Sequence, residues 1–264
     1  MTWQADPVAV VAAPAPSRDR DRIWHQVGRD LRWSFTPPYT WLSGVACNLV
    51  LSLAYVVIAP ITEQPHRDWA ILVGSYFAVF ILADVTTTNV LGADAYRVRL
   101  ALLRGVSLRR ILVVKNLTLM LIVGLPTLIV TAAITLGSEA GYRLILTLPG
   151  VIFPIFTWLG LGNLVSVVYP VAAKPLRRRW EERRQLRRTV RWLGALALPY
   201  ILVLGETRYE KVPKMIVRNL PYVPHDARTA GIVLLSCGVV SYLVGTTIAL
   251  IVAQARKVRF DDLA

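Results

Sequence analysis

The sequence has few of the residues on which disulfide-rich domains and metalloenzymes depend. It contains two cysteines, Cys47 and Cys237, both within apolar stretches, and three histidines, all within polar segments. This usage excludes a disulfide framework and an intramembrane histidine pair that would hold a catalytic metal. The two cysteines are therefore interpreted as small buried hydrophobic residues. Acidic residues are also scarce, with 16 Asp and Glu against 30 Lys and Arg.

Hydrophobic residues, by contrast, are abundant and grouped. They make up 55% of the 264 residues, and the mean hydropathy is +0.51. Soluble domains are nearer 45–50% apolar and lack repeated runs of about 20 apolar residues. The chain is therefore predicted to be an all-α integral membrane protein. The first residues, MTWQADP, carry no basic region typical of a secretory signal, so residues 1–18 are expected to form a mobile cytoplasmic tail.

The apolar runs predict one transmembrane domain over residues 19–264. Its six spans are expected at about 39–59, 69–90, 111–136, 144–169, 192–205 and 230–253. The fifth run, of 14 residues, is about 21 Å long as a helix and shorter than the roughly 30 Å hydrocarbon core. It is either a re-entrant segment or a full span that begins in the preceding basic segment.

An amphipathic helix is predicted at 19–36, before the first span. Ile23, Val27, Leu31 and Phe35 recur every four residues, and polar residues cover the opposite side. This pattern is typical of a helix that lies in the membrane interface. The alternative is a helix packed on a soluble partner.

The distribution of basic residues predicts the orientation. With six spans, 23 of the 30 Lys and Arg residues lie on the side of the two termini. The other side holds seven, namely Arg67, Arg143, Arg208, Lys211, Lys214, Arg218 and Arg228. By the positive-inside rule, both termini and the loop before the third span are cytoplasmic, in a multi-pass cell-membrane protein.

The segment 174–191 is strongly basic, with nine positive residues and two negative ones. In isolation such a segment is compatible with nucleic-acid binding. Next to a membrane span, anionic lipid headgroups are the favoured partner, at about 1 kcal/mol per basic residue near the surface. No nucleic-acid partner is predicted.

A short cytoplasmic helix is predicted at 94–105, between the second and third spans. Asp94 is expected to be its N-cap, Gly105 its C′ residue, and Ser107 the N-cap of the next helix. Spacing places three apolar residues on one stripe and two arginines on another face: Tyr96, Leu100 and Leu103, and Arg97 and Arg104. Such a helix is suited to contact a separate protein. The alternative is a charged turn lying on lipid headgroups.

Two motifs resemble a known family. The run NVLGADAYRVRLALLRGVSLRRILVVKNL at 89–117 resembles the first cytoplasmic loop of ABC-2 type transporter permeases. The run GLGNLVSVVYPVAAK at 160–174 is similar to the end of their fourth helix. The six-span layout and the amphipathic N-terminal helix also fit. The chain departs from the family in its longer, more basic segment after Lys174 and in its short fifth span.

The resemblance implies the permease subunit of an ATP-driven exporter, with the fold of type V exporters. Such a subunit pairs with a second permease copy or a homologous permease, and with two ATP-binding subunits. Helix 94–105 would be the coupling helix and helix 19–36 the connecting helix beside it. The implied contact residues are Asp94, Tyr96, Arg97, Leu100, Leu103, Arg104 and Gly105. The chain has no P-loop, so it is not expected to be an enzyme, and ATP and Mg would bind the partner subunit.

A face of the second span is the candidate substrate path. Phe77, Phe80, Asp84 and Thr87 share that face by helical spacing, and an intramembrane carboxylate usually faces a wet cavity or a partner. The alternative is structural, with Asp84 bonded to a neighbouring helix. Two other functions are open for the chain as a whole: a non-transporting membrane scaffold or assembly protein, and a membrane-embedded enzyme, which lacks the expected intramembrane nucleophile or metal residues.

Overall fold

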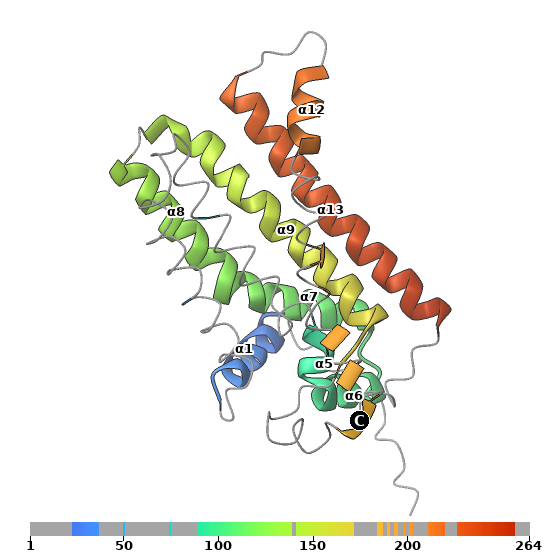
Figure 1. The fold of residues 1–264 in the computed structure, drawn as a ribbon. Helices are drawn as coiled ribbons and strands as arrows, with labels where there is room; N and C mark the ends of the chain where they lie inside the picture. The colour runs from blue at the N-terminus through green and yellow to red at the C-terminus, as the bar shows by residue number, and fades with distance from the viewer. Residues whose placement is uncertain are drawn as a thin grey trace, which may run out of the picture.

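The computed structural model describes the chain in several stretches. They are residues 23–36, 50, 74, 89–138, 141–171, 184–186, 189–190, 193–194, 198, 201–202, 211–219 and 226–256. Within these stretches all regular structure is helical and no strand occurs, so the predicted all-α class is confirmed for them. Figure 1 shows long helices side by side, with short helices gathered near their two ends.

Three helical segments are long and apolar enough to cross a membrane. They are Leu108–Gly137, Gly141–Val168 and Ala227–Ala255. At 1.5 Å per residue, each exceeds the roughly 30 Å hydrocarbon core. They match the third, fourth and sixth predicted spans within a few residues. The predicted spans at 39–59 and 69–90 lie almost wholly outside the described residues and that at 192–205 lies mostly outside them, so the count of six stays a prediction.

The first of these segments is not a uniform α-helix. It consists of α7 (Leu108–Leu119), a π-helical turn (Met120–Gly124) and α8 (Leu125–Ser138). The irregularity near Pro126 takes the form of a wider turn that ends two residues before it. A proline ring clashes with the carbonyl four residues earlier, and π turns are a common site of bending. Figure 1 shows the helix path changing direction between α7 and α8.

The second segment, α9 (Leu144–Val168), is continuous although it contains Pro149 and Pro154. It makes the most extensive helix–helix contact of the described residues, with α13 (Ala227–Ala255). A Cβ added at Gly160 would lie 2.8 Å from the Ser241 carbonyl oxygen and from the Tyr242 Cα. The face of α13 that carries Gly238 and Gly245 is packed against α9 in the same way, because only glycine allows so close a backbone approach.

Polar side chains complete this packing. Asn116 Nδ2 donates to the Tyr242 hydroxyl at 3.1 Å, and Asn163 Nδ2 donates to Thr246 Oγ1 at 2.8 Å. The threonine hydroxyls of α8 donate within their own helical segment rather than to a neighbouring helix. Thr127, Thr131 and Thr135 are buried, and each donates to the carbonyl four residues earlier.

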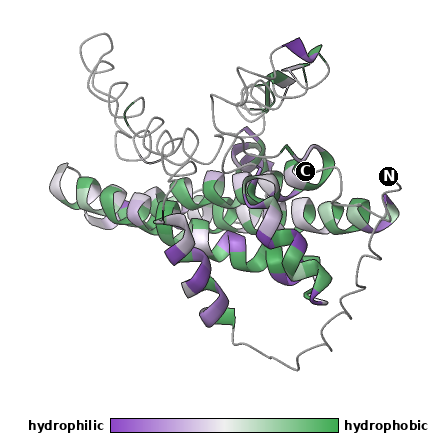
Figure 2. Ribbon diagram, turned by 90° about the horizontal axis from the view of Figure 1, so that it is seen from below, coloured by the Kyte–Doolittle hydropathy of each residue, from purple (hydrophilic) through white to green (hydrophobic). Residues whose placement is uncertain are grey.

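Four short helices lie near the ends of the long ones. Near the end formed by the start of α7 are α1 (Ile23–Ser34), α5 (Val90–Ala93) and α6 (Ala95–Leu103). Beside the N-terminal part of α13 is α12 (Lys211–Asn219), a helix that we did not predict. Its signal was helical spacing, with Lys and Arg at 211, 214 and 218 and apolar residues at 212, 215 and 216. Figure 2 shows that hydrophobic residues predominate along the long helices.

Candidate functional site

The loop before α7 has the local structure that its sequence predicts. Gly105 has φ of 80°, and its N–H donates to the Leu102 carbonyl at 2.9 Å. A left-handed residue at this position ends α6 without steric cost only if it is glycine. The Ser107 side chain then accepts from the Arg110 backbone N–H at 3.4 Å and caps α7. Gly105 and Ser107 thus have the predicted roles.

Asp94 does not have its predicted role. It occupies the N-cap position of α6, but its side chain makes no capping hydrogen bond. Its carboxylate instead accepts from Lys115 Nζ at 2.8 Å. The reason is the burial of Lys115, because a buried ammonium group without an acceptor costs far more free energy than an uncapped first turn. The predicted N-cap position of Asp94 is confirmed, whereas its predicted capping hydrogen bond is absent.

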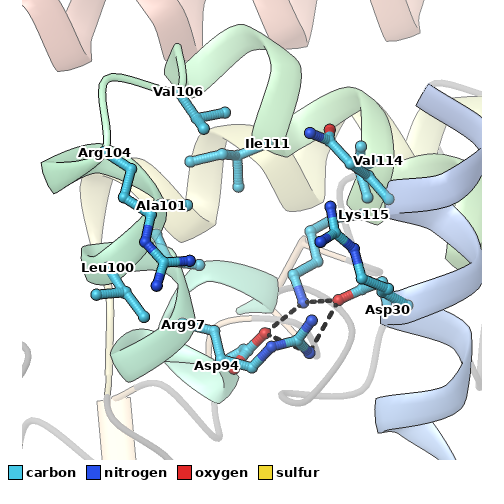
Figure 3. Close-up of a pocket in the computed structure, with 13 residues that line it drawn as sticks. Asp30, Asp94, Arg97, Leu100, Ala101, Arg104, Val106, Ile111, Val114 and Lys115 are labelled. Atoms are coloured by element: carbon cyan, nitrogen blue, oxygen red, sulfur yellow. Dashed lines mark hydrogen bonds and ion pairs between the residues drawn. The ribbon is translucent and has the colours of Figure 1, made fainter. Parts of the chain in front are cut away.

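Asp94 and Lys115 belong to an ion cluster of four residues, three of them buried and the fourth, Arg97, with a side chain 36% exposed. We call it the charge cluster. Lys115 Nζ also donates to Asp30 Oδ1 on α1, at 2.6 Å. Arg97 Nη1 lies 3.3 Å from Asp30 Oδ1 and 3.2 Å from Asp94 Oδ2. Figure 3 shows both cations between the two carboxylates. The charge cluster is neutral overall and joins α1, α6 and α7.

An aromatic ring covers one side of the charge cluster. Lys115 Nζ lies 4.8 Å from the centroid of the Trp33 ring, and Arg97 Cζ lies 5.0 Å from it. Both distances suit cation–π attraction, which is strongest where the cation is desolvated. Burial raises the pKa of the Asp94 carboxyl above its usual value, while Lys115 and Arg97 oppose that rise. The charge on Asp94 therefore depends on its two cationic neighbours.

The side of α1 that faces α7 was not predicted. We placed Gln26 and Asp30 on the exposed polar side, yet Asp30 is 4% exposed and Gln26 Oε1 accepts from Arg110 Nε at 2.9 Å. Val27 and Ser34 are buried on the same side, whereas Ile23 and Trp24 are exposed. A lone lysine a few residues inside an apolar span was the available signal, because such a charge needs a partner.

A cavity of about 340 Å³ opens beside the charge cluster, between α1, α6 and α7. Arg97 and Arg104, predicted to share a face of α6, both line it (Figure 3). The three residues predicted to form one apolar stripe do not all lie on the same side of α6. Tyr96 and Leu103 are 78% and 73% exposed, whereas Leu100 is half-buried and lines the cavity. α6 thus has a cavity side and an exposed outer side.

The loop is also fixed at its beginning. The Asn89 side chain donates to the Val171 carbonyl oxygen and accepts from the Val171 N–H at 3.2 Å. The Arg256 guanidinium donates to the Val168 carbonyl oxygen at 3.2 Å. The ends of α9 and α13 are therefore joined to the segment that begins the loop, at the same end of the molecule as α6 (Figure 1).

The remaining predicted site residues lie elsewhere. Phe77, Phe80, Asp84 and Thr87, the candidate substrate path, lie outside the described residues, as does Cys47. Cys237 is half-buried in α13. In the part of the chain that the structure describes, no group of three or more His, Cys, Asp or Glu residues is arranged to hold a metal ion.

Comparisons with known proteins add no family assignment. No protein-family model matches the chain, and neither a curated protein nor a solved structure is significantly similar to it.

Proposed function

We propose that the chain is the permease subunit of an ATP-driven exporter of the ABC-2 type. The observation that carries this proposal is α6, a short helix held rigidly at one end of the apolar helices with Tyr96 and Leu103 exposed on its outer side. Large exposed apolar side chains on a charged loop are typical of a protein interaction site. The partner would be an ATP-binding subunit, two of which would serve a pair of permeases.

The charge cluster supports a coupling role for α6. Lys115, on the first turns of a membrane helix, contacts Asp94 at the start of α6 and Asp30 on α1. A displacement of α6 would therefore carry α1 and α7 with it, because separating buried ions costs several kcal/mol. In this proposal, closure of the ATP-binding subunits moves α6 and changes the orientation of the membrane helices, which exposes cargo to the other side.

The sequence indicates which functions belong to this chain and which to the partner subunits. ATP and Mg bind the partner subunits, since this chain has no P-loop, and α6 would be at the cytoplasmic end with both termini. The cargo path would run along the Phe77, Phe80, Asp84 and Thr87 face of the second span, and the basic segment 174–191 would lie on anionic headgroups. The class of cargo is not part of the proposal, because similar folds carry unrelated substrates.

Substitution of the outer side of α6 tests the proposal. Leu103→Asp adds a charge to the exposed stripe without touching the charge cluster, so the variant should fold and insert normally. Co-purification with the ATP-binding subunit and transport should both be lost. The matched control is Leu136→Asp, on a leucine of α8 that is 61% exposed at the far end of the span Leu108–Gly137 from α6, which should keep the association with the ATP-binding subunit.

The same experiment distinguishes the permease from the alternative function, a non-transporting scaffold or assembly protein. A non-transporting scaffold or assembly protein would insert in the membrane in the same way and would show no ATP-binding subunit in its complexes. If the wild-type chain and Leu103→Asp co-purify with the same proteins, and none of these proteins carries a P-loop, the proposal is wrong.

A further inference from the structure

The cavity beside the charge cluster has a lining suited to an anion with an apolar stem. Four cationic and two acidic side chains line it, so its wall carries an excess of positive charge. The acidic ones, Asp30 and Asp94, both contact Lys115 and Arg97. Arg104 lies on the same wall without belonging to the charge cluster, and its side chain is exposed. Val98, Val106, Ile111 and Val114 supply the apolar part of the lining.

The position of the cavity along the membrane helix favours a lipid. Ile111, Val114 and Lys115 belong to the first two turns of the span Leu108–Gly137 and lie roughly 5–11 Å from its start at 1.5 Å per residue. The headgroup layer on each side of a bilayer is about 5–8 Å thick. The α7 wall of the cavity therefore spans the headgroup layer and the start of the hydrocarbon, where the phosphate and glycerol of a phospholipid lie.

The helix that forms the other wall fits the same depth. α1 exposes Ile23 and Trp24, and Phe35 directly after it is also exposed. Amphipathic helices with exposed aromatic residues settle at the boundary of headgroups and acyl chains. Its buried side carries Asp30 and Val27 toward α7. A lipid that enters between α1 and α6 would meet arginine side chains for its phosphate and valine and isoleucine side chains for its apolar part in the same cavity.

We infer that this cavity binds the phosphodiester headgroup of an anionic phospholipid, with Arg104 and Arg97 as its main donors. Arginine suits this role because its planar guanidinium donates two parallel hydrogen bonds to phosphate oxygens. The site lies on the cavity side of α6, away from Tyr96 and Leu103. It is thus independent of the protein contact proposed for the outer side, and either can fail without the other.

A lipid titration of the purified full-length protein tests the site. Dioctanoyl phosphatidylglycerol, added to the protein in an uncharged detergent, should raise the unfolding temperature in a saturable manner. Dioctanoyl phosphatidylcholine and sodium phosphate at equal concentrations should not. The Arg104→Gln variant should weaken the apparent affinity for phosphatidylglycerol roughly fivefold, the effect expected of one basic residue near an anionic headgroup.

A matched variant controls for net charge. Arg109→Gln removes the same charge from an exposed position of α7 that does not line the cavity, and should change the affinity less than twofold. A second cavity variant, Ala101→Phe, fills the space without changing charge and should also lower the affinity, provided that its helix content by circular dichroism matches the wild type.

Three results would overturn the inference. In the first, Arg104→Gln and Arg109→Gln respond alike, which would mean general surface attraction. In the second, sodium phosphate stabilises the protein as phosphatidylglycerol does, which would identify a site for a soluble anion. In the third, Arg104→Gln leaves the lipid response unchanged and weakens only the association with an ATP-binding subunit, which would assign the cavity to the partner protein.

Discussion

Lys115 Nζ lies 2.6 Å from Asp30 Oδ1, and this contact joins residues 85 positions apart in the chain. It links an amphipathic helix outside the apolar core to the start of a membrane-spanning segment. Because Asp94 accepts from the same ammonium group at 2.8 Å, three helices meet at one buried charge. The position of α6 relative to α1 and α7 is therefore set by electrostatics as well as by packing.

Removal of the central cation should destabilise the protein strongly. Lys115→Met leaves the Asp30 and Asp94 carboxylates buried with Arg97 as their only cation in the charge cluster, and we expect a loss of about 3 kcal/mol in the free energy of unfolding. Lys214→Met, on the exposed side of α12, should have no measurable effect. The measurement is thermal or denaturant unfolding of the purified protein in detergent.

The double variant Asp30→Asn with Lys115→Met sharpens this test. It removes one charge of each sign and keeps the Asp94–Arg97 pair, so it should be more stable than Lys115→Met alone. Equal stability of the single and double variants would show that the Asp30–Lys115 contact contributes nothing specific.

The close approach of α9 and α13 should depend on Gly160. A Cβ at this position would meet backbone atoms of α13 at 2.8 Å, which cannot move aside as a side chain can. Gly160→Ala should therefore lower the free energy of unfolding by roughly 1–3 kcal/mol, the usual cost of overpacking.

The matched control is Gly137→Ala at the end of α8, where a Cβ would meet nothing within 4 Å. There the substitution should be neutral or slightly stabilising, because alanine favours the helix over glycine. The measurement is the free energy of unfolding of the two variants in the same detergent. Equal values for both variants would contradict the packing described for Gly160.

The predicted orientation can be tested by thiol labelling in intact cells. In a background without Cys47 and Cys237, a cysteine in place of Lys214 should react with a membrane-impermeant maleimide. A cysteine in place of Ser107 should react only after the cells are permeabilised. Both positions are exposed in the structure, so failure to react reports the side of the membrane. Labelling of the Ser107 position in intact cells would reverse the orientation.

The sequence predicted the elements of this protein better than their contacts. Runs of about 25 apolar residues can form little other than membrane helices, and Gly105 and Ser107 determine their local turns by steric and hydrogen-bonding preference alone. The pairing of Asp30 with Lys115 depends on how distant helices pack. Periodicity placed Asp30 on the polar side of α1, and that side faces α7 because it meets a buried cation there.

The α12 helix and the π-helical turn were missed for a different reason. In α12 charged residues are interspersed among the apolar ones, so the stretch reads as a polar loop unless its spacing is considered. Pro126 indicates a kink in the helix. It does not predict that the helix widens to a π-helical turn at Met120–Gly124, just before the proline. The predictions that concern 39–59, 69–90 and 174–191 fall on residues that the structure leaves almost wholly undescribed.

Site-specific photo-crosslinking at α6 tests the central claim most directly. A photoreactive phenylalanine analogue in place of Tyr96 or Leu103, both more than 70% exposed, is irradiated in living cells, and the same analogue in place of Tyr142, at the opposite end of the long helices, serves as the control. We predict that both α6 positions capture a protein that mass spectrometry identifies as carrying a P-loop, and that position 142 does not. Capture of no such protein at either α6 position would contradict the assignment of α6 as the contact with an ATP-binding subunit.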